Sequence, residues 1–488
     1  MSNLYRHLSL ASLLVLSSCF PSLALANTWN CPIEKSWLTA PSLPTEVDKS
    51  NKDNTSNFCD FYRFSTQAYL YLMSPSSDKS GKRNFQVNAN YPVLEYNGDN
   101  SPGNSCDKEI TGHTLLTSLE QSSISTGQAG GDATIYAQDG NVAYYDVRFN
   151  KALCDLTGSA TEMQQQGIYN FPGGTTELKF AWKVLSAVEV RSGQFVTQEQ
   201  LISGKMKTLG LLGMHIAIAT ADHPEFVWAT YEHKTNSPDC DASASQKKQA
   251  WMFADKTCTQ ALPGSAEKGD KCNFNHPELG LTAPTGTPTN ICRIHPYGTA
   301  KGDRDAAENL GDILSQNQSL LDQLAKSSTP DAMKVLTNYF NLGAIWVSDI
   351  AQSSGGVGVP NERGSLRLAN SVAETDYQDV NLNSQFASNC FGCHNYQGTA
   401  EAQKNNITTQ ALSHTFKDIK IGQGQHIDVT ASSYIASNEQ AAGICGVTGK
   451  SEKEQGTCKG TASFLKWDGN WTNANTSAGS VCGCGPDK

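Results

Sequence analysis

The sequence has 488 residues, with 37 Lys and Arg against 47 Asp and Glu, which gives a net charge of −10. This acidic balance argues against nucleic acid and anionic membrane surfaces as partners, and it is compatible with a cationic redox partner protein. Only 17% of the residues are charged and 41 are glycine, so we expect many loops and short strands rather than long helices.

Residues 1–26 have the pattern of a secretory signal peptide. Arg6 lies in a short polar start, the apolar run Leu8–Phe20 is too short to span a bilayer, and Ala24–Ala26 is a small-residue cleavage site. We therefore expect the protein in the periplasm or secreted. An alternative is open, because Leu-Ser-Ser-Cys ending at Cys19 resembles a lipobox and would make the protein an outer-membrane lipoprotein. The rest of the chain has no apolar run long enough for a transmembrane segment.

The first half of the remaining chain predicts one helix followed by strands. Apolar residues recur at helical spacing over Phe58–Met73, which predicts a buried helix. A second, shorter helix is expected over 110–122. Asp139-Gly140 is a strong hairpin signal between two half-buried strands. Three further strands are expected from alternating or continuous apolar runs, over Leu178–Val190, Leu209–Thr220 and Phe226–His233.

The second half predicts loops and then helices. Residues 234–300 are rich in Pro, Asn, Lys and Gly, whereas 305–326 has helical periodicity. A further helix is expected from Pro330 towards Trp346. The fold class we predict is α+β: a β-rich N-terminal and central region and a helical C-terminal part, loop-rich and tied by disulfides. The expected domains are 27–300, a mixed domain with a β-rich core, and 301–488, a helical and irregular region.

The cysteines indicate an oxidising compartment. Of 15 cysteines, Cys19 belongs to the signal and two belong to the motif described next, which leaves twelve. An even number in an exported chain argues for up to six disulfides. Connectivity cannot be read from the sequence, and short-range pairs such as Cys31–Cys59, Cys240–Cys258, Cys272–Cys292 and Cys445–Cys458 are the simplest expectation.

Residues 390–394 read Cys-Phe-Gly-Cys-His, which is the attachment signature of c-type haem. The thiols of Cys390 and Cys393 can add to the two vinyl groups of one porphyrin, and His394 can then bind the iron as proximal ligand. A disulfide beside an unrelated His and half of a zinc site are the alternatives. A zinc ribbon needs a second C-x-x-C, and the sequence has none. We expect one covalent haem c.

The sixth iron ligand is less determined. No Met follows Met333, so the His/Met ligation of small cytochromes has no downstream donor. His414 and His426 are local candidates, and His215, His233 and Met214 are upstream candidates; of these, His414 and His215 are the two we select as metal ligands. An open or water-filled site is the remaining option.

Five segments of the chain are similar to segments of a known protein family: FSTQAYLYL (64–72), KFAWKVL (179–185), GLLGMHIAI (210–218), WATYEHKTN (228–236) and CFGCHN (390–395). With them the chain resembles a family of large exported bacterial proteins described only as cytochrome c family proteins, from about residue 57 to residue 420. The resemblance implies one covalent haem c and a periplasmic location, and it supplies no substrate. Related chains carry an aromatic-rich segment with alternating Phe after the motif, where this chain has His414.

The sequence thus predicts an exported mono-haem c-type cytochrome that transfers electrons in the periplasm. The alternative is a haem enzyme, peroxidase-like, or a haem-based ligand sensor, with a pocket built from region 130–235. In that case His215, Trp228 and His233 are the residues to test. A binding protein with a structural haem is a third reading. Oligomeric state and substrate are not predicted.

Overall fold

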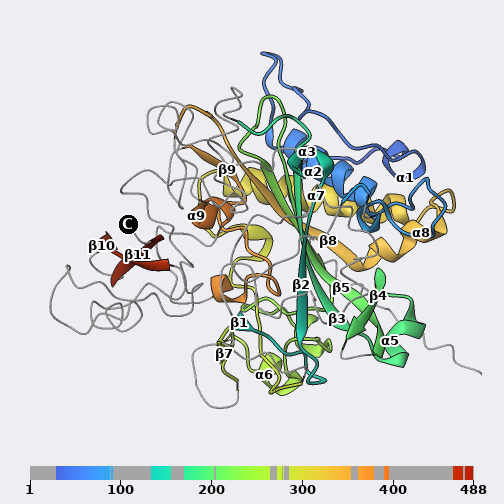
Figure 1. The fold of residues 1–488 in the computed structure, drawn as a ribbon, viewed down its shortest axis with the longest axis vertical. Coiled ribbons are helices and arrows are strands. Elements are labelled where there is room, and N and C mark those ends of the chain that lie inside the picture. Colours follow the sequence, from blue (N-terminus) through green and yellow to red (C-terminus); the bar gives the residue numbers. More distant parts are fainter. Residues whose placement is uncertain are drawn as a thin grey trace, which may run out of the picture.

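The computed structural model describes residues 29–87, 89–91, 133–154, 170–202, 205–263, 272–276, 278–279, 285–352, 361–378, 389–394, 465–475 and 479–486 (Figure 1). Several predicted features lie outside these residues: the signal peptide with Cys19, the helix over 110–122, His414, His426 and the pair Cys445–Cys458.

The fold is α+β, organised by a seven-stranded antiparallel sheet in the order β2-β3-β5-β6-β8-β9, with β4 paired to β5 (Figure 1). Its strands are β2 (Ala143–Phe149), β3 (Thr176–Val184), β4 (Thr197–Ile202), β5 (Lys205–Ile218), β6 (Val227–His233), β8 (Tyr339–Val347) and β9 (Glu362–Gly364). The pairing of β6 with β8 joins segments about 110 residues apart, so the sheet includes strands from both sides of position 300.

The other elements are shorter or lie around this sheet. Two-stranded sheets are formed by β1 (Ala133–Thr134) with β7 (Glu278–Leu279) and by β10 (Leu465–Asn475) with β11 (Gly479–Pro486). The α-helices are α1 (Ser36–Thr39), α2 (Phe58–Met73), α3 (Lys151–Cys154), α5 (Ala187–Ser192), α6 (Lys256–Gln260), α7 (Ala306–Leu324), α8 (Asp331–Lys334) and α9 (Cys390–His394). The 3-10 helices are η1 (Asn84–Gln86), η3 (Gln246–Lys248), η4 (Pro296–Gly298), η5 (Val335–Asn338) and η6 (Thr375–Gln378). In the part of the chain described here, no helix has the length and apolar character needed to cross a membrane.

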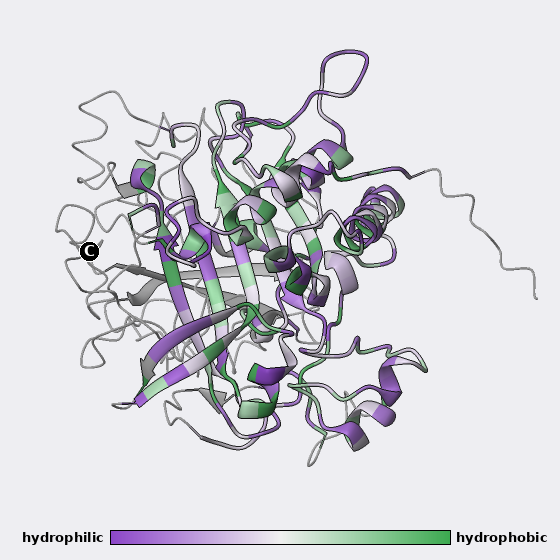
Figure 2. Cartoon of the chain, turned by 90° about the vertical axis from the view of Figure 1, so that its right-hand side faces the viewer, coloured by the Kyte–Doolittle hydropathy of each residue, from purple (hydrophilic) through white to green (hydrophobic). Residues whose placement is uncertain are grey.

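Alternation along the strands gives the sheet two different faces (Figure 2). We call the side covered by α2 and α7 the helical face. The opposite side, covered by α9 and by the segment 361–378, is the motif face; Figure 1 shows α9 across the sheet from α2 and α7. On β6, Val227, Ala229 and Tyr231 belong to the core of the helical face, while Trp228 belongs to that of the motif face.

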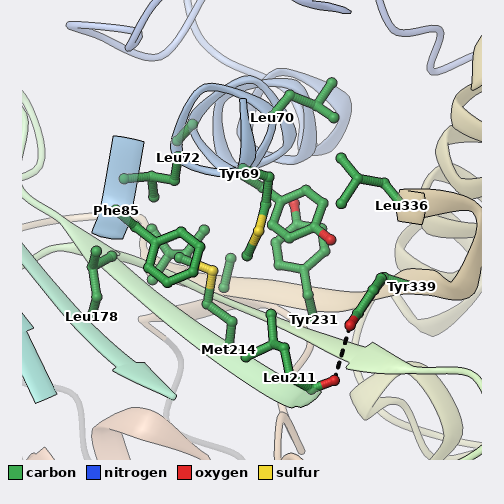
Figure 3. Close-up of a cluster of buried hydrophobic side chains, with 14 of the residues drawn as sticks. Tyr69, Leu70, Leu72, Phe85, Leu178, Leu211, Met214, Tyr231, Leu336 and Tyr339 are labelled. Atoms are coloured by element: carbon green, nitrogen blue, oxygen red, sulfur yellow. Dashed lines mark hydrogen bonds between the residues drawn. The ribbon is translucent and has the colours of Figure 1, made fainter. Parts of the chain in front are cut away.

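The helical face carries the larger apolar core. Figure 3 shows Leu70 and Leu72 of α2 above Met214 of β5 and Tyr231 of β6, all of them fully buried. The ring of Tyr69 stacks on that of Tyr231 with centroids 3.8 Å apart. Burial of side chains this large is the main favourable term in folding.

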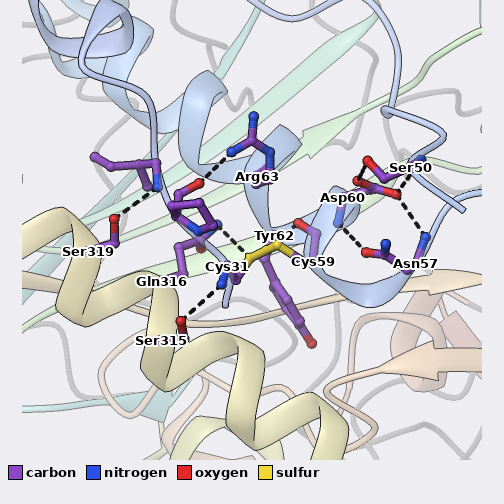
Figure 4. Close-up of a disulfide and its surroundings, with 12 residues drawn as sticks. Cys31, Ser50, Asn57, Cys59, Asp60, Tyr62, Arg63, Ser315, Gln316 and Ser319 are labelled. Carbon is purple, nitrogen blue, oxygen red and sulfur yellow. Dashed lines mark hydrogen bonds between the residues drawn. A yellow bond between two sulfur atoms is a disulfide. The ribbon is translucent and has the colours of Figure 1, made fainter. Parts of the chain in front are cut away.

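The chain before α2 is tied to two helices. A disulfide joins Cys31 to Cys59 in the first turn of α2, as the sequence predicted (Figure 4). The backbone N–H of Cys31 donates to Ser315 Oγ of α7 at 3.0 Å. Asn57 and Asp60 form a capping box, in which each side chain accepts a hydrogen bond from the other's backbone N–H. This segment therefore brings α2 and α7 together over the sheet.

Three predicted elements need correction. The strand expected over Leu178–Val190 ends at Val184, and α5 follows, because Ser186 and Glu189 form a capping box. The helix expected from Pro330 to Trp346 stops at Asn338, and the rest is β8, whose aromatic and β-branched residues pair with β6 and β9. At Asp139-Gly140 the turn is present, with Gly140 at φ +79°, but the arm before it forms only an isolated bridge, and β2 is almost fully buried.

Two predicted disulfide pairings are also wrong. The structure joins Cys240 to Cys292 and Cys258 to Cys272, rather than Cys240 to Cys258 and Cys272 to Cys292. A parallel bridge between Asp239 and Arg293, in which Cys240 N–H donates to the Arg293 carbonyl at 2.8 Å, brings the first pair together. Cys258 and Cys272 are only 14 residues apart, so the error lay in pairing the cysteines in chain order. Backbone pairing decides which thiols meet.

Candidate functional site

The C-x-x-C-H motif forms α9, a single helical turn that lies on the motif face. Positions three and four apart lie on one side of a helix, so positions 390, 393 and 394 share a side of α9. Position 391 is three residues before position 394 and therefore adjoins it on the turn, and the Phe391 side chain is fully buried. The turn thus places an anchoring residue beside the positions that carry the chemistry.

Two interactions hold α9 against the sheet. Asn389, which precedes the helix and is 4% exposed, donates through Nδ2 to Glu362 Oε2 of β9 and to the Leu366 carbonyl, both at 2.8 Å. Phe391 packs into an apolar cluster formed with residues of three strands and a loop: Ala217, Trp228, Leu342, Ile345 and Leu368. Asn389 and Glu362 were not singled out from the sequence, since no local pattern marks a contact between residues 27 positions apart.

The imidazole of His394 lies in this cluster and not in solvent. His394 is 8% exposed, and its ring centroid is 4.5 Å from the ring of Trp228 on β6, with an interplanar angle of 43°. Trp228 is 5% exposed, and its indole meets the Phe391 ring edge-on at 6.2 Å. The structure therefore brings together His394 and Trp228, which the sequence analysis had considered separately.

These residues fit a covalently bound haem. One helical turn carries both cysteine positions and the His, the residues that would hold a haem through two thioethers and an imidazole. The buried cluster beside the turn is aromatic and aliphatic. Among the described side chains, no group of three or more His, Cys, Asp or Glu residues could hold a metal ion.

His215, a predicted distal candidate, lies on the motif face of β5. It pairs across the sheet with Thr230, while Ala217, two residues further on, pairs with Trp228. Two residues of strand correspond to about 7 Å, so His215 lies one row of side chains away from Trp228. Its Nε2 is 3.0 Å from Glu374 Oε1, but the angles there fall outside those of a hydrogen bond, so we treat the pair as an electrostatic contact.

His233 and Met214 lie on the helical face, away from α9. Both ring nitrogens of His233 have partners: Nδ1 with Thr235 Oγ1 at 2.8 Å, and Nε2 with the Gln194 carbonyl at 3.1 Å. Burial lowers the pKa of His233 to about 4. This histidine is a neutral core residue, and Met214 is part of the apolar core.

Both faces contain buried ionisable groups. On the helical face Arg148 pairs with Asp146 at 2.9 Å beside Phe85 and Phe180, and on the motif face Arg293 pairs with Glu232. Arg293 Nη2 lies 2.5 Å from Glu232 Oε2, and both side chains are almost fully buried. The same carboxylate accepts hydrogen bonds from the backbone N–H and the hydroxyl of Ser371. Near Trp228, Glu225 is fully buried, and burial raises the pKa of its carboxyl although His223 Nδ1 lies 3.0 Å away. Each face therefore buries an ion pair, and the helical face has the larger apolar core.

No protein-family model matches the sequence, and comparisons with curated proteins and with solved structures give no match. The functional interpretation consequently depends on the residues and their geometry alone.

Proposed function

We propose that the protein is an exported mono-haem c-type cytochrome that transfers electrons in the periplasm. The observation that carries this proposal is the conformation of Cys390–His394, a single helical turn with His394 packed against Trp228. Cys390 and Cys393 would hold the haem through thioethers, and His394 would be its proximal ligand. A bound haem c supplies reversible one-electron chemistry.

The surrounding residues support this role in three ways. Phe391 fixes α9 on the sheet, because its side chain is fully buried among residues of the motif face. Asn389 holds the start of α9 in place, because its Nδ2 donates hydrogen bonds to Glu362 Oε2 and to the Leu366 carbonyl. Trp228 and its apolar neighbours exclude water from one side of His394. Such exclusion is one of the protein's means of tuning a redox site.

The three disulfides among the described residues are compatible with an oxidising, exported location, where haem attachment of this type takes place. The net charge of −10 suits a cationic redox partner protein.

The attachment is tested by expressing the full chain in a bacterial host that has a cytochrome c maturation system. After denaturing electrophoresis, the wild-type band should stain for haem, and the Cys393→Ala band should have lost the double attachment. A matched control replaces Cys31 and Cys59 together, which removes a disulfide remote from α9 and should leave the staining intact. Normal staining of Cys393→Ala would reject the proposal.

The type of function is tested by optical spectra of the purified protein. A low-spin ferrous spectrum that carbon monoxide does not change is expected of an electron carrier. A high-spin ferric spectrum that shifts with cyanide or peroxide would instead favour the haem enzyme or the ligand sensor. In that case His215, one row from Trp228 on the motif face, would be the first residue to replace.

A further inference from the structure

The contact between Trp228 and His394 joins strand β6 to helix α9, which are far apart in the sequence, and several independent contacts orient the indole. Its Nε1–H donates to the backbone carbonyl of Glu225 at 3.1 Å. The ring of Phe226 meets it edge-on, with centroids 5.4 Å apart and an interplanar angle of 83°. Phe391 meets it edge-on as well. The indole therefore has a hydrogen bond and two aromatic contacts, and it also contacts the imidazole of His394.

The turn that supplies the Glu225 carbonyl is strained. Phe226 has φ +70°, a left-handed conformation that bulky side chains rarely adopt. The turn is closed by hydrogen bonds: Phe226 N–H donates to the His223 carbonyl at 3.2 Å, and His223 N–H donates to Thr220 Oγ1 at 2.9 Å. Phe226 is fully buried and packs on Phe171 at 4.4 Å, which holds the strained conformation in place.

Strain of this kind costs on the order of 1–3 kcal/mol and persists only where the surrounding structure enforces it. Such positions cluster at functional sites. Here a glycine would remove the strain, yet the chain has a phenylalanine whose ring contacts Trp228. The result of the strained turn is a carbonyl aimed at the indole N–H, immediately beside the candidate haem ligand.

We infer that Trp228 is a positioning residue for His394: it fixes the orientation of the imidazole and shields it from water, and thereby sets the reduction potential of the haem. This inference rests on the proposed function. Groups that contact a metal's ligands orient them and tune the metal, and solvent exposure is among the factors that set haem potentials. Loss of the indole admits water, which stabilises the more highly charged ferric state, so the potential falls.

The test compares three variants of the full-length, haem-loaded protein. Trp228→Leu removes the aromatic face and the N–H. Trp228→Phe keeps an aromatic face, so it still provides a test if the leucine variant fails to fold. Trp346→Phe is the matched control, since Trp346 is equally buried but stacks on Phe61 at 3.9 Å on the helical face.

Two properties are measured, the reduction potential and the electron paramagnetic resonance spectrum of the ferric protein, whose g-values depend on the orientation of the axial imidazole. Trp228→Leu should shift the equilibrium constant for reduction about threefold to tenfold towards the ferric state, and tenfold corresponds to about 59 mV for one electron. Trp228→Phe should shift it less in the same direction, with altered g-values. Trp346→Phe should match the wild type in both.

The outcomes separate the two proposals. If the wild-type chain carries no covalent haem, the proposed function fails and this inference with it. If haem is attached but both Trp228 variants have the potential and g-values of Trp346→Phe, the positioning role is rejected while the cytochrome assignment stands.

Discussion

The two faces of the sheet are built differently. The helical face is closed by α2 and α7, continuous helices whose aliphatic and aromatic side chains form a large core. The motif face is closed by the one-turn helix α9 and the segment 361–378, and it contains the buried pair of Glu232 with Arg293 and the contact of His394 with Trp228. The helical face also buries an ion pair, Arg148 with Asp146 at 2.9 Å, so the faces do not differ in the presence of buried charges. They differ in their cover: long helices stabilise one face, and the other holds α9 and the strained turn at Phe226.

The largest effect is expected from breaking the buried ion pair of the motif face. Arg293→Met leaves the Glu232 carboxylate buried without its cation, and removal of one partner of such a pair costs about 3–5 kcal/mol. The free energy of unfolding from urea titration measures this. The double variant with Glu232→Gln should regain part of the loss. A loss below about 1 kcal/mol for Arg293→Met would show that the pair is not needed to hold segment 361–378 in place.

Matched truncations on the two faces sharpen the comparison. Leu70 on the helical face and Leu342 on the motif face are both fully buried, so replacement of either by Ala should cost about 2–5 kcal/mol. Only Leu342→Ala should also change the visible spectrum or the reduction potential, because Leu342 belongs to the cluster around Phe391. Equal spectral effects of the two variants would remove the functional distinction between the faces.

A pH-dependent effect is expected from His233 on the helical face. Its pKa in the folded protein is about 4, below the ordinary value of 6.5, because burial disfavours the charged imidazole. Between these values the unfolded chain binds a proton that the folded chain does not, so the stabilisation is complete above pH 6.5 and is lost as the pH falls towards 4. From pH 7 to pH 5 this histidine should cost up to about 2 kcal/mol of stability.

The variant His233→Phe isolates this contribution. Phe can keep the stacking on Phe195, whose ring centroid is 4.3 Å away, but it does not titrate. Urea titrations at pH 7 and pH 5 should therefore show a smaller loss of stability for the variant than for the wild type. The same loss in both proteins would mean that His233 is protonated in the folded state.

The smallest effect concerns a hydroxyl in the apolar core. Tyr69 Oη is buried and has no hydrogen-bond partner among the residues that the structure describes. Tyr69→Phe removes this group and keeps the stacking on Tyr231, so it should be neutral or stabilise the fold by up to about 1 kcal/mol. Thermal or urea unfolding measures the change, and a destabilisation above about 1 kcal/mol would reveal a partner for the hydroxyl.

Local patterns predicted the elements whose periodicity is strong. The helix Phe58–Met73, the buried strand through Met214 and the short strand ending at His233 are present because their apolar spacing suits the faces they bury. The error at α5 was avoidable, since the Ser186–Glu189 capping box is visible in the sequence. The error at β8 was not, because an apolar run of that length suits either a helix or a strand until its partners β6 and β9 are known.

In the candidate functional site, too, local features could be predicted from the sequence and the contacts between distant residues could not. The motif itself is local and was found from spacing alone, and Trp228 and His215 were singled out as residues of a pocket. Their placement could not be predicted, because it depends on the pairing of β5 with β6 and on Asn389 reaching Glu362. From the sequence, His233 was as good a candidate for the haem pocket as Trp228 and His215. Strand alternation places it on the helical face instead.

The central claim is that residues 390–394 carry one covalent haem. The most direct test is the pyridine haemochrome spectrum of the purified, acid-washed wild-type chain, compared with its protein concentration. One haem per chain, with the band position of a porphyrin that has lost both vinyl groups to thioethers, is the predicted result. A chain without this chromophore, in which the thiols of Cys390 and Cys393 are joined to each other or bind zinc, would contradict the account.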